Sequence, residues 1–125
     1  MSSHKEIYGG LVRLHVLHHA SREPIFGQGI MDELARHGYR LGPGTIYPIL
    51  HGLERSGHLR SRVEKAGRSS RRTYVATVAG RKALQGAKER VWELFTELFE
   101  DELSQEPRLR AAKGRKEAND KGNER

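Results

Sequence analysis

The sequence of 125 residues contains no cysteine. A disulfide framework and a thiolate metal site are therefore both excluded. No apolar run approaches the roughly 20 residues that a membrane-spanning helix needs. The first residues, Met1–Lys5, also lack the apolar core of a secretion signal. We expect a cytoplasmic protein without a membrane partner.

Recognisable catalytic patterns are missing as well. The acidic residues gathered at 93–102 have no histidine nearby in the sequence, and no serine has the flanking glycines of a nucleophile elbow. No glycine-rich loop has the spacing of a phosphate-binding loop. We expect no enzymatic activity and no cofactor.

Positive charge is concentrated in one segment. The net charge is +7, and residues 51–82 carry nine basic and two acidic side chains. A surface that faces nucleic-acid phosphates predicts such a concentration, because each neutralised phosphate releases a counterion. An ordinary solvated basic face is the alternative.

The segment Pro43–Glu54 combines a buried helical stripe with polar and aromatic residues outside it. Ile46, Ile49, Leu50 and Leu53 fall at i, i+3, i+4 and i+7, which indicates one buried helix face. The residues largely outside this stripe are Thr45, Tyr47, Pro48 and His51. Residues 59–63, which alternate apolar or small residues with arginine, and residues 71–77 then predict a basic hairpin with an irregular polar tip.

Two helices are predicted before this segment. The first covers residues 6–20, with Ile7, Leu11, Leu14 and Leu17–His18 on one side. The second covers residues 27–37, with Ile30, Met31 and Leu34 facing inward, and Gly38 follows where a left-handed cap usually lies. Helix, helix, turn, helix and hairpin is the order of a winged helix-turn-helix, whose third helix reads duplex DNA. We therefore expect a mainly α fold with a small β hairpin.

A long helix is predicted after Thr77, which is a plausible N-cap. Its apolar residues form two adjacent stripes, too wide a face for the margin of a small domain. We expect this face to bind the same helix of a second copy. The predicted domains are a winged helix at 1–78, a dimerisation helix at 79–103 and a flexible basic tail at 104–125. The predicted dimer-interface residues are Leu84, Val91, Trp92, Leu94, Phe95, Leu98 and Phe99.

The chain resembles the PadR family of bacterial transcriptional regulators between about Leu11 and Leu84. The resemblance depends on Leu14–Ala20, Pro24–Gly27, Leu41–Glu54 and Arg71–Gly80. The combination of Pro-Gly-Thr-Ile-Tyr-Pro with the later Arg-Arg-Thr-Tyr-Val-Ala-Thr-Val-Ala-Gly is specific. Two positions depart from the family pattern: Gly52 stands where a basic residue is common, and Phe26 replaces a common tyrosine.

The resemblance implies a homodimer of the short family form, held together by the C-terminal helices and the first helix. It implies that each third helix enters the major groove at one half-site of a near-palindromic operator, while the hairpins contact backbone or minor groove. We expect a repressor that binds double-stranded DNA. The residues expected to contact DNA are Gly44, Thr45, Tyr47, Pro48, His51, Lys65, Arg68, Arg71, Arg72 and Tyr74. Arg71 or Arg72 pairing with Glu54 or Glu64 instead is an alternative.

The histidines of the first predicted helix have a spacing that is also found in metal sites. His15, His18 and His19 lie at i, i+3 and i+4 of the first helix, a spacing that could hold a divalent metal ion. We expect packed histidines and no metal site, because the family pattern itself runs through these positions.

Trp92 is a candidate residue for binding a small-molecule effector. Some short family members resemble multidrug sensors that stack flat ligands between paired tryptophans, and Trp92 lies about one residue from that position. A small-molecule effector at Trp92, a metal-responsive sensor and a winged-helix module that binds protein are the alternatives to a repressor.

Overall fold

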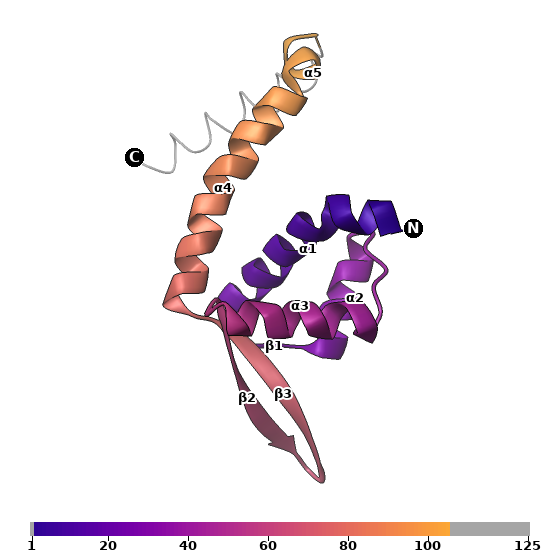
Figure 1. Cartoon of the computed structure of the whole chain (residues 1–125), viewed down its shortest axis with the longest axis vertical. Coiled ribbons are helices and arrows are strands. Elements are labelled where there is room, and N and C mark those ends of the chain that lie inside the picture. Colours follow the sequence, from indigo (N-terminus) through magenta and orange to yellow (C-terminus); the bar gives the residue numbers. More distant parts are fainter. Residues whose placement is uncertain (1, 106–125) are drawn as a thin grey trace, which may run out of the picture. The chain divides into compact units, whose positions relative to one another are not determined.

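The computed structural model describes residues 2–105. The helices and strands follow the predicted order (Figure 1). They are α1 (Ser2–Arg22), β1 (Ile25–Phe26), α2 (Gly27–Arg36), α3 (Pro43–Arg55), β2 (Leu59–Ala66), β3 (Ser69–Ala76), α4 (Val78–Leu98) and α5 (Glu100–Gln105). No helix among these residues is long and apolar enough to span a membrane. The chain divides into two compact units, one up to Ala87 and one from Lys88 onward.

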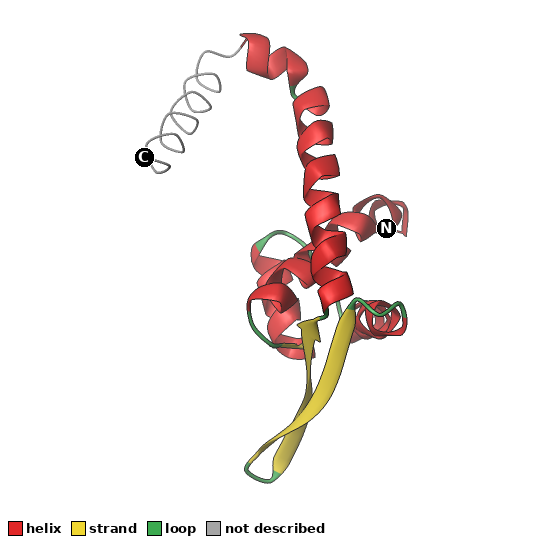
Figure 2. Ribbon diagram, turned by 90° about the vertical axis from the view of Figure 1, so that its left-hand side faces the viewer, coloured by secondary structure: helices red, strands yellow, loops and turns green. Residues whose placement is uncertain are grey.

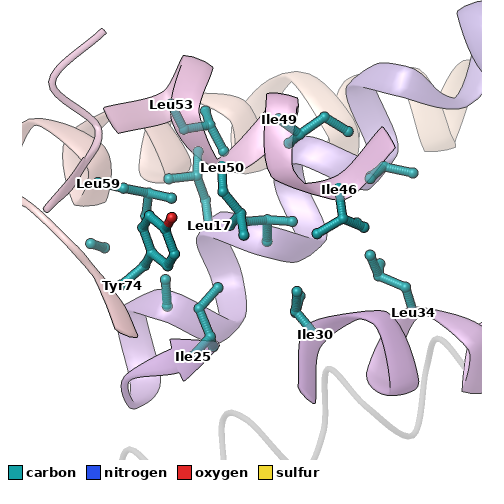
Figure 3. Close-up of a cluster of buried hydrophobic side chains, with 14 residues drawn as sticks. Leu17, Ile25, Ile30, Leu34, Ile46, Ile49, Leu50, Leu53, Leu59 and Tyr74 are labelled. Atoms are coloured by element: carbon teal, nitrogen blue, oxygen red, sulfur yellow. The ribbon is translucent and has the colours of Figure 1, made fainter. Parts of the chain in front are cut away.

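The core of the first unit lies among α1, α2, α3 and the sheet (Figure 3). The predicted α3 stripe is confirmed, since Ile46, Ile49, Leu50 and Leu53 are all buried. In α2, Ile30 and Leu34 are buried and Met31 packs against the core from its edge. The buried stripe therefore fixes which side of α3 remains available to a ligand.

The prediction for α1 was partly wrong. Leu17 is buried, but Ile7 and Leu11 are 71% and 43% exposed. The buried stripe instead runs through Val12, Val16 and Ala20, which are successive i, i+4 positions on one helix face. Leu11 lies about 100° around the helix from Val12, so it leaves an exposed apolar patch together with Ile7.

Left-handed glycines end both helices of the helix-turn-helix. Gly38, with φ 92°, ends α2, where the Tyr39 N–H donates to the Leu34 carbonyl oxygen at 2.9 Å. Gly57, with φ 83°, ends α3 in the same way. A glycine adopts this conformation without the steric penalty that a β-carbon brings. The cap predicted at Gly38 is confirmed.

The wing, defined as β2, β3 and the Gly67–Arg68 connection, is the predicted hairpin (Figure 2). Ala66 pairs with Ser69, so the connection has two residues, and Gly67 has the positive φ of 66° that a type II′ turn needs at its first central position. The sequence did not indicate β1, which adds to β3 and makes the sheet order β1-β3-β2. A strand of two residues is too short to show alternation.

Thr77 is the predicted N-cap of α4. Its hydroxyl accepts a hydrogen bond from the Gly80 N–H at 3.0 Å and donates one to the Gly57 carbonyl oxygen at 2.6 Å. Helix α4 was expected to continue to residue 103, but it ends at Leu98 and α5 begins at Glu100. Three acidic residues in the first turn of α5 favour a new helix start there, because they complement the helix dipole. Residues 104 and 105 belong to α5, and the rest of the predicted tail lies outside the described residues.

Candidate nucleic-acid interface

The outer side of α3 carries the groups that were expected to contact DNA. Gly44, Tyr47, Pro48 and His51 are exposed, and Thr45 is half-buried. Gly42 caps the helix N-terminus without any side-chain hydrogen bond, and Pro43 occupies the first turn. Pro43 has no N–H, and the Thr45 and Ile46 N–H groups donate to the Gly42 carbonyl oxygen at 3.1 and 3.0 Å. The positive end of the helix dipole still favours an anion here.

Tyr47 lies between the exposed surface and the start of α2. Its side chain is 38% exposed, and its ring centroid lies 6.2 Å from that of His51. A β-carbon on Gly27, the first residue of α2, would overlap the Tyr47 hydroxyl and the adjoining ring atoms. Gly27 therefore makes room for this tyrosine, and the start of α2 fixes where its ring can lie.

Arg71 and Arg72 lie on opposite faces of the wing, because successive residues of a strand alternate between faces. The Arg71 guanidinium lies 3.7 Å above the centroid of the Phe26 ring, a cation–π contact with β1. Arg72 Nη1 donates to Ser61 Oγ at 3.0 Å. Phe26, the residue that departs from the family pattern, thus positions one of the two arginines.

Ser61 connects the wing to α3. Its Oγ donates to Glu54 Oε2 at 2.5 Å, and its backbone N–H donates to the same oxygen at 3.2 Å. Glu64 pairs with Arg62 instead, at 3.0 Å. Among the ion pairs of residues 2–105, none joins Glu54 or Glu64 to either Arg71 or Arg72. Both arginines therefore keep charge to offer to phosphate.

The wing carries further exposed basic groups. Lys65 and Arg68 are exposed at the tip, as their predicted role requires. Arg60 and Arg62 are exposed on the Arg71 face of the wing, and the candidate residues had not included them. Their alternation with Leu59 and Ser61 was a usable signal, because it places both arginines on the face away from the core.

Tyr74 corrects one prediction. It was expected to contact DNA, but its side chain is 1% exposed and belongs to the core (Figure 3). Strand β3 places Tyr74 on the same face as Leu59 and Ala76, which face the helices. Burial, with the nearby Glu54 charge as a smaller cause, raises the pKa of the Tyr74 hydroxyl. That hydroxyl has no hydrogen-bond partner among the described residues.

We expect Tyr74→Phe to raise the free energy of unfolding by about 1 kcal/mol, since an unpaired buried polar group costs about 1–3 kcal/mol. Urea denaturation with an unchanged m-value is the measurement. The affinity for DNA should stay that of the wild type. A loss of stability would mean that the hydroxyl has a partner, such as a buried water, whose hydrogen bond outweighs the desolvation cost.

The second unit exposes a row of apolar residues. Val91, Trp92, Leu94, Phe95, Leu98 and Phe99 are all exposed. The rings of Trp92 and Phe95 stack with centroids 5.7 Å apart, and those of Phe95 and Phe99 are 4.9 Å apart. Leu84, assigned to the same interface, belongs to the first unit and packs against its core. The uncovered face therefore begins after Leu84.

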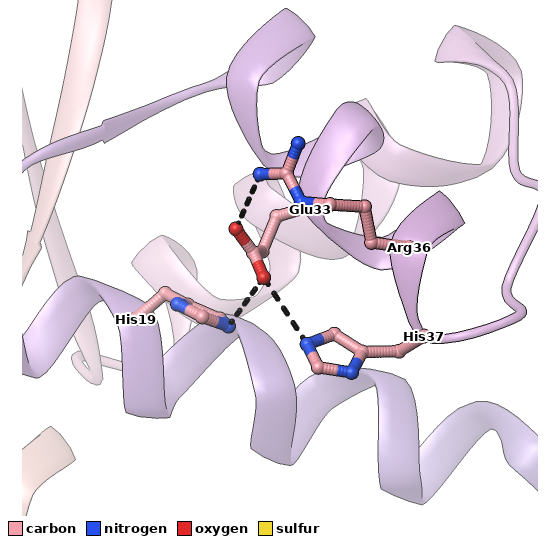
Figure 4. A network of polar contacts seen from close by, with 4 residues as sticks. All are labelled: His19, Glu33, Arg36 and His37. Atoms are coloured by element: carbon pink, nitrogen blue, oxygen red, sulfur yellow. Dashed lines mark hydrogen bonds and ion pairs between the residues drawn. The ribbon is translucent and has the colours of Figure 1, made fainter.

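Histidine, glutamate and arginine side chains meet where α1 passes the end of α2 (Figure 4). The sequence grouped His15 and His19 with His18, but the structure brings them together with His37. His18 is exposed and lies outside the group. Glu33 contacts both His19 and His37, and Arg36 contacts Glu33. Sequence spacing could not indicate His37, which the fold brings to α1 from another helix.

Comparisons with known proteins agree with this geometry. Residues 16–86 match the model of the transcriptional regulator PadR-like family. The transcriptional regulator Rv3488 of Mycobacterium tuberculosis is 45% identical over 95 residues, which cover 76% of this chain and 89% of that protein.

Solved structures agree as well. A PadR family transcriptional regulator from Eggerthella lenta has a TM-score of 0.68 at 28% identity, covering 83% of this chain and 91% of that chain. For a PadR-like transcriptional regulator from Bacillus cereus the TM-score is 0.70 at 22% identity, over 80% and 97% of the two chains, which shows a shared fold. The chain thus belongs to the PadR-like family of transcriptional regulators, which are DNA-binding proteins and not enzymes.

Proposed function

We propose that the chain is a repressor that binds a near-palindromic operator as a homodimer. The observation that carries this proposal is the outer side of α3. It presents Tyr47, Pro48 and His51 to the surface, opposite the buried stripe. The outer side of a helix held in this way by a core can enter the major groove of duplex DNA.

The wing supports the same function through its charge. Arg60, Arg62, Arg71 and Arg72 are exposed along the strands, and Lys65 and Arg68 are exposed at or beside the tip. Contacts to phosphates position a protein on DNA, while contacts to base edges select the sequence. We assign the wing mainly to phosphates and the outer side of α3 to bases.

The apolar face of α4 supports dimerisation. Exposed apolar side chains from Val91 to Phe99 form a continuous row, and a row of this kind usually marks a protein interface. The exposed Ile7 and Leu11 on α1 supply a second patch to the same dimer, as the family resemblance implies. Two recognition helices in one dimer then bind two half-sites, which a near-palindromic operator provides.

Repression is the simpler regulatory outcome. A small dimer that covers a promoter blocks polymerase without any further contact. A small-molecule effector, if one binds beside Trp92, would change the angle between the two recognition units and so break their match to the groove spacing.

A salt titration tests this function. Fluorescence anisotropy with DNA from the gene's own upstream region, and an unrelated duplex as control, should show tighter binding to the upstream DNA. The affinity should fall steeply as salt rises. Tyr47→Ala should remove most of the preference for the upstream DNA. Binding insensitive to salt and to Tyr47→Ala would instead support a module that binds protein.

Substitution of the wing tip should change affinity without changing sequence preference. We expect Lys65→Ala combined with Arg68→Ala to weaken binding to both duplexes by the same factor. The slope of log affinity against log salt should become shallower by about 0.9 for each phosphate that the variant no longer neutralises. Anisotropy titrations at several salt concentrations measure both effects. A weakening confined to the upstream DNA would assign the wing tip to bases instead.

A further inference from the structure

Three histidines from two helices place their ring nitrogens close together. His15 and His19 lie one turn apart on α1, and His37 directly follows α2. One nitrogen from each ring lies within 4.8 Å of the others. The rings of His15 and His37 stack with centroids 4.8 Å apart. Each ring therefore already lies beside the point at which the three nitrogens converge.

Glu33 adds a carboxylate oxygen to this group. Glu33 Oε2 lies 3.1 Å from His37 Nε2 and 3.9 Å from His19 Nε2 (Figure 4). The other oxygen, Oε1, accepts a hydrogen bond from Arg36 Nη2 at 2.6 Å. Arg36 thus holds the carboxylate with its second oxygen toward the imidazoles, as an outer partner holds a metal ligand.

We propose that His15, His19, His37 and Glu33 form a site for a divalent transition-metal ion of the zinc class, bridging α1 and the end of α2. Three imidazoles and one carboxylate form a common donor set for zinc and related ions. A tetrahedral zinc ion places its ligand nitrogens about 3.3 Å apart. Closure from the present spacing to that geometry needs shifts of about 1–1.5 Å, which small side-chain rotations supply.

The surroundings of the two α1 histidines disfavour their protonated forms. Burial, followed by the neighbouring imidazoles of His37, His19 and His18, lowers the pKa of His15. Burial also lowers the pKa of His19. Only a neutral imidazole has a lone pair available to a metal ion. His37 is exposed, so an ion can enter from solvent without opening the core.

The proposal is tested by measuring metal binding to the protein in the absence of DNA. The probe is zinc ion titrated into the full chain, free of any affinity tag, in competition with a chromophoric chelator. Cobalt(II) ion reports the ligand geometry by its visible absorption. We expect one ion per chain in the wild type, tetrahedral cobalt bands, and a melting temperature that rises with zinc.

Single substitutions separate this site from adventitious binding. Loss of an outer partner of a metal ligand costs about 10–100-fold in affinity, so we expect loss of a ligand in Glu33→Gln, His15→Ala or His37→Ala to weaken zinc binding by at least that much. His18→Ala is the matched control on the same helix and should bind as the wild type does. His37→Ala removes a side chain that is exposed but contacts Glu33 and His15, so its circular dichroism spectrum without metal should show that the fold is retained.

Two results would overturn the proposal. One is zinc binding by the double variant His15→Ala, His37→Ala that is as tight as in the wild type. The other is an equal loss in His18→Ala, which would mean that histidines bind zinc without regard to the fold. Either result would leave Glu33, His19 and His37 as a hydrogen-bonded contact between α1 and α2.

The position of the site predicts an effect on DNA binding, and this step rests on the proposed function. His37 directly precedes the connection from α2 to α3. An ion bound to His37 and to α1 would fix the end of α2, and with it the start of the recognition helix. Zinc should therefore change operator affinity in the wild type and not in His37→Ala. Equal affinities with and without zinc would overturn this coupling, while the titration without DNA still decides the site.

Discussion

Gly80→Ala is expected to destabilise the fold, although alanine is the better helix former. A β-carbon at this position would overlap the backbone carbonyl oxygen of His58 and lie 3.0 Å from its carbonyl carbon. That oxygen is also fixed, since it accepts a hydrogen bond from the Thr77 N–H at 3.1 Å. A side chain can rotate away from such a clash, but a carbonyl that joins α3 to the wing cannot.

Two opposing free-energy terms decide whether Gly80→Ala stabilises or destabilises the fold. Alanine gains about 1 kcal/mol over glycine inside a helix, whereas an added methyl group in a packed site costs about 1–3 kcal/mol and sometimes more. The higher end applies here because the obstacle is backbone. We expect a net loss of about 1–2 kcal/mol, which corresponds to a melting temperature lower by roughly 4–16 °C for a domain of this size.

Gly86→Ala is the matched control in the same helix. A β-carbon on Gly86 would have no atom within 4 Å, so only the helix propensity should act. We expect a gain of up to about 1 kcal/mol, measured by the same thermal melts. If both variants were stabilised alike, the close approach of α4 to His58 would be wrong.

The sequence was sufficient to predict features that depend on one helix or strand alone. The α3 stripe at Ile46, Ile49, Leu50 and Leu53 is periodic along one helix, and its burial follows directly. Thr77 acts as an N-cap through a bond to Gly80, three residues away. Such features depend on local geometry, which residue order alone describes.

The sequence was insufficient where two elements meet. Thr73 and Tyr74 are consecutive and both buried, so β3 is covered on both faces at that point. Alternation could not show this, so Tyr74 was placed at the DNA. In the same way, spacing along α1 grouped His15 and His19 with His18, whereas the fold brings His37 to them. Contacts of this kind depend on packing between elements.

Phe95→Glu is expected to convert the proposed dimer into monomers. Phe95 lies in the middle of the exposed row, with its ring between Trp92 on one side and Phe99 on the other. In a symmetric interface one substitution places two new charges in one apolar contact. Each charge would lose its hydration without gaining an ion pair or a hydrogen bond, so its burial would destabilise the interface. Analytical ultracentrifugation measures the change in mass.

Phe95→Glu should also weaken operator binding, although it leaves the recognition helix α3 unchanged. Once one protomer of a dimer has bound its half-site, the other protomer is held close to the second half-site. This high effective concentration raises the affinity of the dimer for the whole operator by about 10²–10⁴-fold. A monomer keeps its recognition helix and wing but loses this gain. We therefore expect operator affinity to fall by at least about 100-fold, while weak binding to an unrelated duplex changes little.

Arg90→Glu is the matched control for Phe95→Glu. It introduces the same side chain into the same helix, about 140° around the axis from Phe95, on the side where Glu93 and Glu97 lie. This variant should remain a dimer. If Phe95→Glu also remained a dimer with full operator affinity, the apolar row would serve another partner, and the two recognition helices would have to be joined through the exposed Ile7 and Leu11 of α1 alone.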